Sequence, residues 1–164
     1  MTENWITIIL SSAIVSVIIS GLTTYFIEKR KYSQEYWKIT IDKRLEAYEE
    51  IEKLLIFFQT THLVNDNPCH LAFLNIDKFD DLQEQLGIIS WKRSWISSKL
   101  YKKIIKLNRV LIEFDSLETN DISNFGVKNY SKIADIRDVI IKIIAEDYLN
   151  MPKVKSFFKS KIKE

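Results

Sequence analysis

Residues 5–27, WITIILSSAIVSVIISGLTTYFI, carry no charge and are followed at once by EKRK at residues 28–31. As a helix this segment extends about 34 Å, more than the roughly 30 Å hydrocarbon core of a bilayer. A cleaved signal peptide is the alternative, but no Lys or Arg precedes the segment, it is too long, and no A-x-A cleavage site follows it. We therefore predict a transmembrane anchor within residues 1–30.

The charges on either side of this segment predict its direction. Lys29, Arg30 and Lys31 follow it, whereas only Glu3 precedes it. Positively charged flanks stay on the cytoplasmic side of a membrane. We expect the N-terminus outside and residues 31–164 in the cytoplasm.

Small side chains form a stripe along the anchor. Such spacing lets membrane helices approach closely and share hydroxyl hydrogen bonds, so it predicts that copies of the chain associate. The hydroxyls of associated copies could also face a narrow polar lumen. The alternative is that each hydroxyl bonds to a carbonyl one turn earlier in its own helix. The predicted packing residues are Ser12, Ser16, Ser20, Gly21 and Thr24.

The remainder, residues 31–164, is expected to be one helical domain. Three glycines and two prolines in the whole chain leave few sites for tight turns, which favours helices over a many-stranded sheet. Residues 28–58 contain neither residue type and keep a near-heptad apolar spacing, so residues 31–60 are predicted to form a stalk-like helix. The predicted class is all-α, a single N-terminal transmembrane helix that continues into a compact cytosolic helical domain.

Turn and cap residues predict where the next helices begin and end. Residues 65–70, NDNPCH, are the first clear break. Asn75 is a typical N-cap and Gly87 a typical stop, so we expect a helix between them. Another helix is expected to start between Ser90 and Ser97.

The last part of the chain is predicted to be a loop at residues 115–129, a helix at residues 130–150, and a basic tail at residues 153–164. The tail has three possible roles, as an arm for the anionic inner leaflet, as a wall of an anion site, or as a disordered end. Apolar periodicity predicts a core made of Ile41, Leu45, Tyr48, Leu55, Phe58, Phe79, Leu82, Leu86, Leu100, Ile104, Leu107, Leu111, Phe114, Ile133, Ile136, Ile140 and Ile143.

Charge is nearly balanced overall but unevenly distributed. Lys+Arg total 24 and Asp+Glu 22, so we expect no general attraction to nucleic acid and no DNA partner. Residues 91–112 are basic without a single acid, between acidic stretches at residues 61–90 and 113–125. Cations and free N–H groups at a helix start bind phosphate, and aromatic faces stack on bases. The candidate ligand-binding residues are Trp91, Lys92, Arg93, Trp95, Ser98, Lys99, Lys102 and Lys103.

The alternative for this basic stretch is a charged helix face paired with the flanking acids, with its tryptophans in the core. Metal binding is not expected, because His62, Cys69 and His70 match no common zinc spacing. A Gly-rich phosphate loop and a nucleophile elbow are missing from the sequence, so we expect neither an enzyme nor a cofactor.

The order of an uncharged span, the EKRK stop, and KRLEAYEEIEKLL at residues 43–55 resembles small bacterial membrane proteins of anti-phage defence. It is most similar to the cyclic tetra-adenylate-binding membrane effector of type III CRISPR systems. The resemblance implies an anchor in the bacterial inner membrane and a homo-oligomer, with a tetramer favoured. It also implies that the cytosolic domain binds a cyclic oligoadenylate and rearranges the transmembrane helices to disrupt the membrane. The alternative is a membrane-tethered helical scaffold, or interaction module, that recruits a protein partner.

Overall fold

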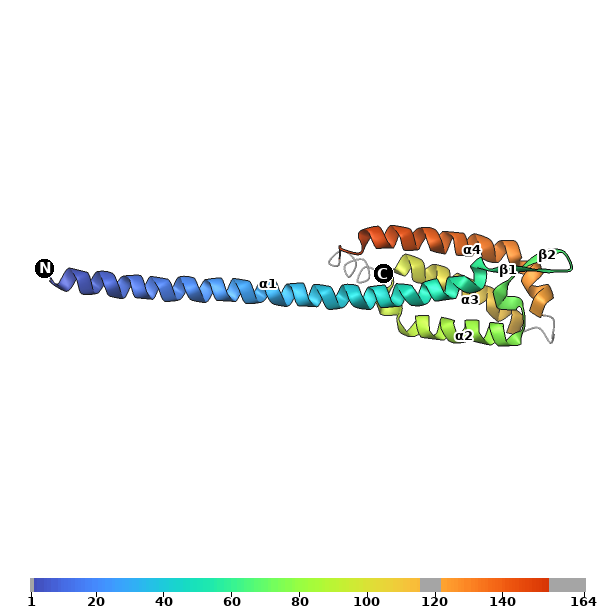
Figure 1. Ribbon diagram of the computed structural model, residues 1–164, viewed down its shortest axis with the longest axis horizontal. Helices are drawn as coiled ribbons and strands as arrows, with labels where there is room; N and C mark the ends of the chain where they lie inside the picture. The colour runs from blue at the N-terminus through green and yellow to red at the C-terminus, as the bar shows by residue number, and fades with distance from the viewer. Residues whose placement is uncertain (1, 116–121, 154–164) are drawn as a thin grey trace. The chain divides into compact units, whose positions relative to one another are not determined.

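The computed structural model describes the backbone of residues 2–115 and 122–153, and the side chains of residues 12–114 and 122–153. It is mostly helical and divides into two compact units, residues 1–40 and 41–164. Its elements, labelled in Figure 1, are α1 (Thr2–Gln59), β1 (Thr61–Val64), β2 (Asn67–His70), the 3-10 helix η1 (Leu71–Phe73), α2 (Ile76–Trp91), the 3-10 helix η2 (Arg93–Trp95), α3 (Ser98–Asp115) and α4 (Ile122–Asn150).

The first unit is the N-terminal part of α1. Its large apolar side chains are exposed, including Val17 at 71% and Phe26 at 62%. A continuous row of such side chains is unfavourable in water and suits the hydrocarbon of a bilayer. By length and composition, α1 contains a segment that could cross a membrane. The direction of such a crossing stays a prediction.

The predicted small-residue stripe lies on this exposed part of α1. A Cβ atom added at Gly21 would meet nothing within 4 Å, so the position has room for a close neighbour. The alternative, a hydroxyl that bonds to a carbonyl one turn earlier in its own helix, is seen at a neighbouring residue. There the Thr23 hydroxyl donates to the Ile19 carbonyl at 2.7 Å. Association through the stripe stays a prediction. The exposed stripe residues are Ser12, Ser16, Ser20, Gly21 and Thr24.

In the second unit, the C-terminal part of α1 packs with α2, α3 and α4 as a helical bundle (Figure 1). All the predicted core residues of α2, α3 and α4 are buried, which confirms the helical periodicity there. In α1 the prediction is wrong for Leu45, which is 38% exposed. The adjacent Arg44 is buried instead, and its guanidinium donates to the Met151 carbonyl at 3.0 Å. A sequence pattern that counts only apolar residues does not detect a buried cation.

A β-hairpin corrects the all-α prediction. β1 and β2 pair antiparallel, with Val64 opposite Asn67 across a two-residue turn. The turn residues Asn65 and Asp66 have φ of 48° and 63°, a conformation that Asn and Asp tolerate better than other non-glycine residues. The predicted break at residues 65–70 is therefore the turn and second strand of a hairpin.

Of three predicted helix boundaries, two agree with the structure and one differs. The Lys78 N–H donates to the Asn75 side chain at 2.9 Å, which confirms Asn75 as the N-cap of α2. Gly87 does not end α2, because Ile89 in the following turn is buried in the core and the helix continues to Trp91. The start of α3 falls at the edge of the predicted interval, where the Ser97 hydroxyl accepts from the Leu100 N–H at 3.2 Å.

The loop prediction for residues 115–129 is wrong from Ile122 onward, where α4 has already begun. Residues 116–121 lie outside the described chain, as do residues 154–164 of the predicted tail. Gly126 allows this first part of α4 to pack closely. A Cβ atom there would lie 2.6 Å from both Cys69 Sγ and Phe73 Cβ, so the glycine lets α4 approach β2 and η1 closely.

Candidate anion-binding site

The N-terminal end of α3, where the sequence predicts phosphate binding, is occupied by a carboxylate of the protein itself. Asp147 on α4 accepts hydrogen bonds from the Ser97 hydroxyl at 2.6 Å and the Tyr48 hydroxyl at 2.7 Å. The Ser97 N–H in turn donates to the Tyr48 oxygen at 3.3 Å. Because a carboxylate near a helix N-terminus satisfies the same charge preference as a phosphate, this end of α3 is already neutralised.

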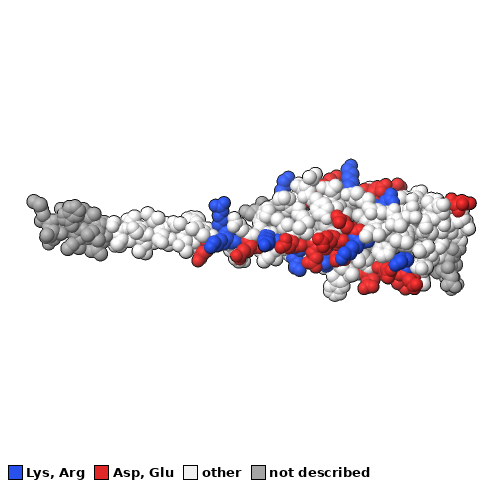
Figure 2. All heavy atoms as spheres, in the orientation of Figure 1, with Lys and Arg blue, Asp and Glu red and all other residues white. Residues whose placement is uncertain are grey.

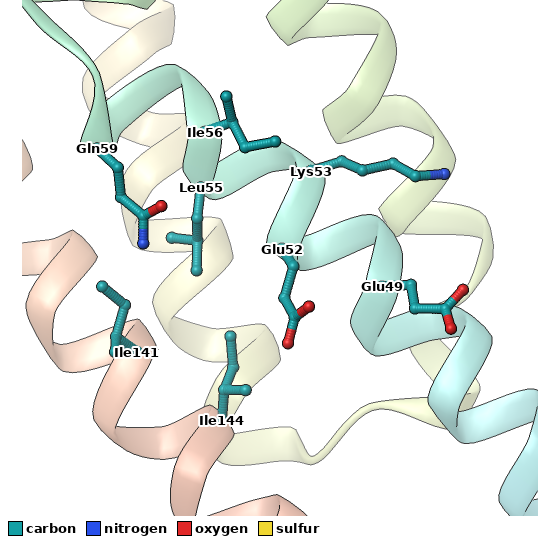
Figure 3. A pocket seen from close by; sticks show the side chains of 8 residues that line it. All are labelled: Glu49, Glu52, Lys53, Leu55, Ile56, Gln59, Ile141 and Ile144. Carbon is teal, nitrogen blue, oxygen red and sulfur yellow. The ribbon is translucent and has the colours of Figure 1, made fainter.

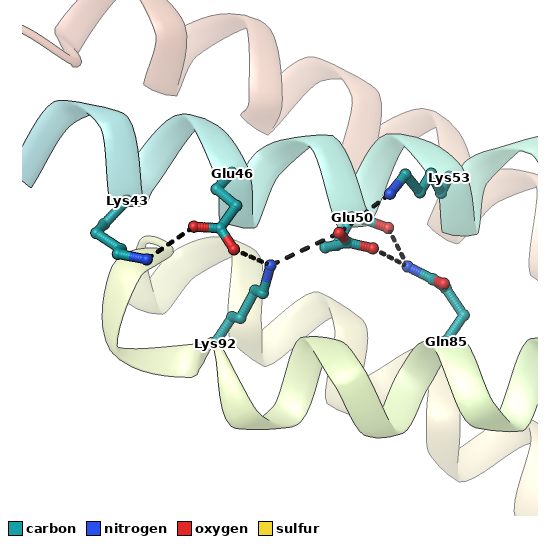
Figure 4. Close-up of polar contacts among 6 residues, drawn as sticks. All are labelled: Lys43, Glu46, Glu50, Lys53, Gln85 and Lys92. Atoms are coloured by element: carbon teal, nitrogen blue, oxygen red, sulfur yellow. Dashed lines mark hydrogen bonds and ion pairs between the residues drawn. The ribbon is translucent and has the colours of Figure 1, made fainter.

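Lys92 belongs to a second carboxylate cluster (Figure 4). Its ammonium lies 2.8 Å from Glu46 and 3.6 Å from Glu50, both on α1. Hydrogen bonds from Lys92 and Lys43 lower the pKa of the Glu46 carboxyl to about 2. Gln85 donates to Glu50 at 2.9 Å, which completes a polar contact between α1 and α2. Lys92 therefore links the end of α2 to α1. Because its ammonium already lies beside two carboxylates, it is a poor partner for an anionic ligand.

The other predicted residues at this end are also separated by the fold. Lys99 pairs with Glu146 at 2.6 Å, and the Arg93 guanidinium lies 5.6 Å from the centre of the Tyr101 ring. Trp95 packs against the core, whereas Trp91 is 90% exposed. The two tryptophans thus lie in different environments rather than forming one stacking platform. Ser98 is the first residue of α3 and Lys102 is exposed one turn later.

Lys103, the last predicted residue, lies in a groove between α3 and α4 that we call the lysine groove. It has a volume of about 430 Å³ and is lined by Lys103, Lys106, Lys132, Asp135, Ile136 and Val139. Residues three or four apart lie on one face of a helix, so each helix presents one stripe to the groove. The groove therefore combines three ammonium groups and one carboxylate with an apolar floor.

The charges of the lysine groove are only partly neutralised by the protein. Lys132 lies 3.4 Å from Glu113, in a pair whose two side chains are 49% and 59% exposed. Within the described chain, neither Lys103 nor Lys106 has a carboxylate within ion-pair distance. Exposed ion pairs of this kind are weak. An anionic group in the groove would thus gain two free ammonium partners and compete with a weak pair for the third.

Sequence reasoning missed Lys132 and Asp147, because both are distant along the chain from the basic stretch. Each reaches its site only through the packing of α4 against α3. Asp147 is the more informative case. The residues around the start of α3 do not reveal that a carboxylate from α4 lies beside it.

Two of the three residues considered for metal binding, Cys69 and His70, have structural contacts. The His70 ring is buried and stacks on Tyr130 with ring centres 4.4 Å apart. Cys69 is buried beneath α4, where the Sγ lies 3.8 Å from the Ser123 carbonyl, and burial raises the pKa of its thiol. Among the described residues, no group of three His, Cys, Asp or Glu side chains is placed to hold a metal ion.

No protein-family model matches this chain, and no curated protein or solved structure is detectably similar to it. A function must therefore be proposed from the chemistry of its own residues.

Proposed function

We propose that this protein is a membrane-anchored effector whose helical domain senses an anionic ligand in the lysine groove. The observation that carries the proposal is that, among the described residues, Lys103 and Lys106 have no carboxylate within ion-pair distance while they line a groove with Lys132. A phosphate-bearing ligand offers several acceptor oxygens for such ammonium groups, and the apolar floor suits its less polar part. A cyclic oligoadenylate, the ligand that the family resemblance implies, has both features.

The position of the groove suggests how binding would act. A ligand held by Lys103 and Lys106 on α3 and by Lys132 on α4 would favour the arrangement of the two helices that brings these cations together. It can shift the protein toward that arrangement only to the extent that it binds it more tightly than the alternatives. The buried residues of α1 belong to the same helical bundle as α3 and α4. The N-terminal part of α1 is the apolar segment that could cross a membrane. In an oligomer, such a shift would rearrange the anchors and breach the membrane.

Native mass spectrometry of the full-length protein in detergent, with a panel of cyclic nucleotides that includes cyclic tetra-adenylate, tests the proposal. The K103E/K106E variant should bind the ligand at least about 10-fold more weakly than the wild type, because two charge-assisted hydrogen bonds are lost. The K99E/K102E variant has the same change in charge on the same helix but leaves the groove intact, so its affinity should change much less.

Two results would contradict the proposal. Equal losses of affinity in the two variants would indicate that the ligand binds at the start of α3, or that its attraction to the lysines is unspecific. If the wild type binds none of the anions at any concentration tested, the membrane-tethered scaffold becomes the better interpretation.

A further inference from the structure

A second groove lies between α1 and α4, on residues that belong to the second unit alone (Figure 3). We call it the α1/α4 groove. Its volume is about 630 Å³, larger than that of the lysine groove. Leu55 and Ile144 form a buried base, while Ile56 is 53% exposed and Ile141 is 38% exposed. The remaining lining residues are Glu49, Glu52, Lys53 and Gln59.

The polar rim of this groove is acidic. Glu49 is exposed, and Glu52 accepts a hydrogen bond from the Tyr148 hydroxyl at 2.7 Å. Lys53 offsets little of this charge, because its ammonium is directed to Glu50 at 3.1 Å, and Figure 3 shows its side chain extending away from the two isoleucines of α4. An occupant that fits the groove therefore needs apolar side chains on one face and cations beside them.

The chain itself contains such a segment. Residues 154–164, outside the described chain, read VKSFFKSKIKE. Their apolar residues Val154, Phe157, Phe158 and Ile162 recur at helical intervals. The segment also contains four lysines and one glutamate. This segment matches the groove in both apolar pattern and charge.

The chain enters this segment beside the two helices that form the groove. The Arg44 guanidinium of α1 donates to the Met151 carbonyl at 3.0 Å, and the Lys153 N–H donates to the Asn150 carbonyl at 2.9 Å. Pro152 cannot continue α4 as a regular helix. Along α1, the groove begins with Glu49 about 8 Å from Arg44 and ends with Gln59 about 23 Å from it. Eleven residues span about 16 Å as a helix and up to roughly 36 Å when extended.

We propose that residues 154–164 bind the α1/α4 groove of their own chain, with their phenylalanines on Ile56 and Ile141 and their lysines beside Glu49 and Glu52. The same lysines would be attracted to an anionic lipid surface. Because one segment cannot occupy both places, binding in the groove withholds it from the membrane. This inference does not depend on the lysine groove.

A photo-crosslinking amino acid at Phe158, in the full-length protein in nanodiscs of zwitterionic lipid, tests the proposal. The expected products join this position to peptides that contain Glu49–Gln59 or Ile141–Ile144 of the same chain. Mixing isotope-labelled and unlabelled protein distinguishes crosslinks within a chain from crosslinks between chains. Products that join only lipid, only another chain, or only other surfaces of the same chain would overturn the proposal.

Substitutions on the groove provide a second measurement. Glu49→Lys should lower the yield of the expected crosslink by about fivefold, because it reverses a rim charge beside the lysines. Ile56→Asp should lower it further by removing part of the apolar floor, and both side chains are exposed enough for the fold to tolerate the change. Glu84→Lys on α2 is the matched control and should leave the yield unchanged. An unchanged yield in both groove variants, with an unchanged circular dichroism spectrum, would reject the groove as the binding surface.

Discussion

The two ends of the basic stretch, residues 91–112, use the same kinds of residue for different purposes. At the N-terminal end, Lys92, Lys99 and Ser97 each contact a carboxylate from α1 or α4. Further along, Lys103 and Lys106 line a groove in which, among the described residues, no carboxylate lies within ion-pair distance of either ammonium. On the surface drawn in Figure 2, basic and acidic side chains are intermixed over the helical domain. The difference teaches that a run of lysines in a sequence is a candidate anion site only where the fold does not pair them with carboxylates of other helices.

The largest expected effect is at the paired end. Asp147→Ala removes the acceptor of the Tyr48 and Ser97 hydroxyls, and we expect it to lower the free energy of unfolding by about 3 kcal/mol. Lys103→Ala in the groove should change it by less than about 0.5 kcal/mol. Denaturation of the full-length protein in detergent, followed by far-UV circular dichroism, measures both. Similar losses in the two variants would remove the distinction between the two ends.

A smaller loss is expected for Tyr48→Phe, which takes away one of the two donors to Asp147. We expect the free energy of unfolding to fall by about 1.5 kcal/mol. Burial, together with the hydrogen bond to Asp147, raises the pKa of Tyr48 from 10.0 to about 12. The neutral hydroxyl is therefore favoured in the folded protein, and its contribution to stability is present below pH 10 and lost as the pH rises toward 12. Thermal melts across this alkaline range should show a shallower loss for the variant than for the wild type.

Acidic pH should destabilise the protein through the carboxylate cluster around Lys92. Since Lys92 and Lys43 lower the pKa of Glu46 from 4.5 to about 2, the charged carboxylate is favoured in the folded protein. Its contribution is present above pH 4.5 and is lost as the pH falls toward 2. Lys92→Met should reduce the drop in melting temperature over this acidic range. An identical drop in wild type and variant would show that Lys92 does not stabilise the bundle.

The smallest effect is expected for Lys99→Ala. Lys99 is 61% exposed and its partner Glu146 is 45% exposed, so water and salt weaken their attraction. We expect no measurable change in melting temperature. A clear fall in melting temperature would show that this pair stabilises the bundle, as is expected for the contacts of Lys92.

Sequence patterns were sufficient for the helical bundle because burial repeats with the helix period. Leu100, Leu107 and Ile140 are buried as their spacing predicts. The hairpin was missed because its turn depends on two residues in the left-handed region, Asn65 and Asp66, within a segment too short for a strand pattern to be clear. The early start of α4 was missed because the polar residues around Ile122 conceal one buried turn.

The candidate site, the lysine groove, could be predicted only in part, for a different reason. Local sequence locates cations, but whether a cation is free depends on acids contributed by other helices. Lys92 pairs with Glu46, which precedes it by 46 residues, and Lys99 pairs with Glu146, which follows it by 47 residues. Of the predicted binding residues, Lys103 is the one that lines the lysine groove.

The buried thiol of Cys69 has a practical consequence for locating the first unit in a cell. A thiol with a raised pKa and no solvent access reacts slowly with maleimides. Since the sequence contains a single cysteine, a second one introduced at Lys29 would be the main site of labelling in the folded protein. A membrane-impermeant reagent added to intact cells would then report directly which side of the bilayer that position occupies.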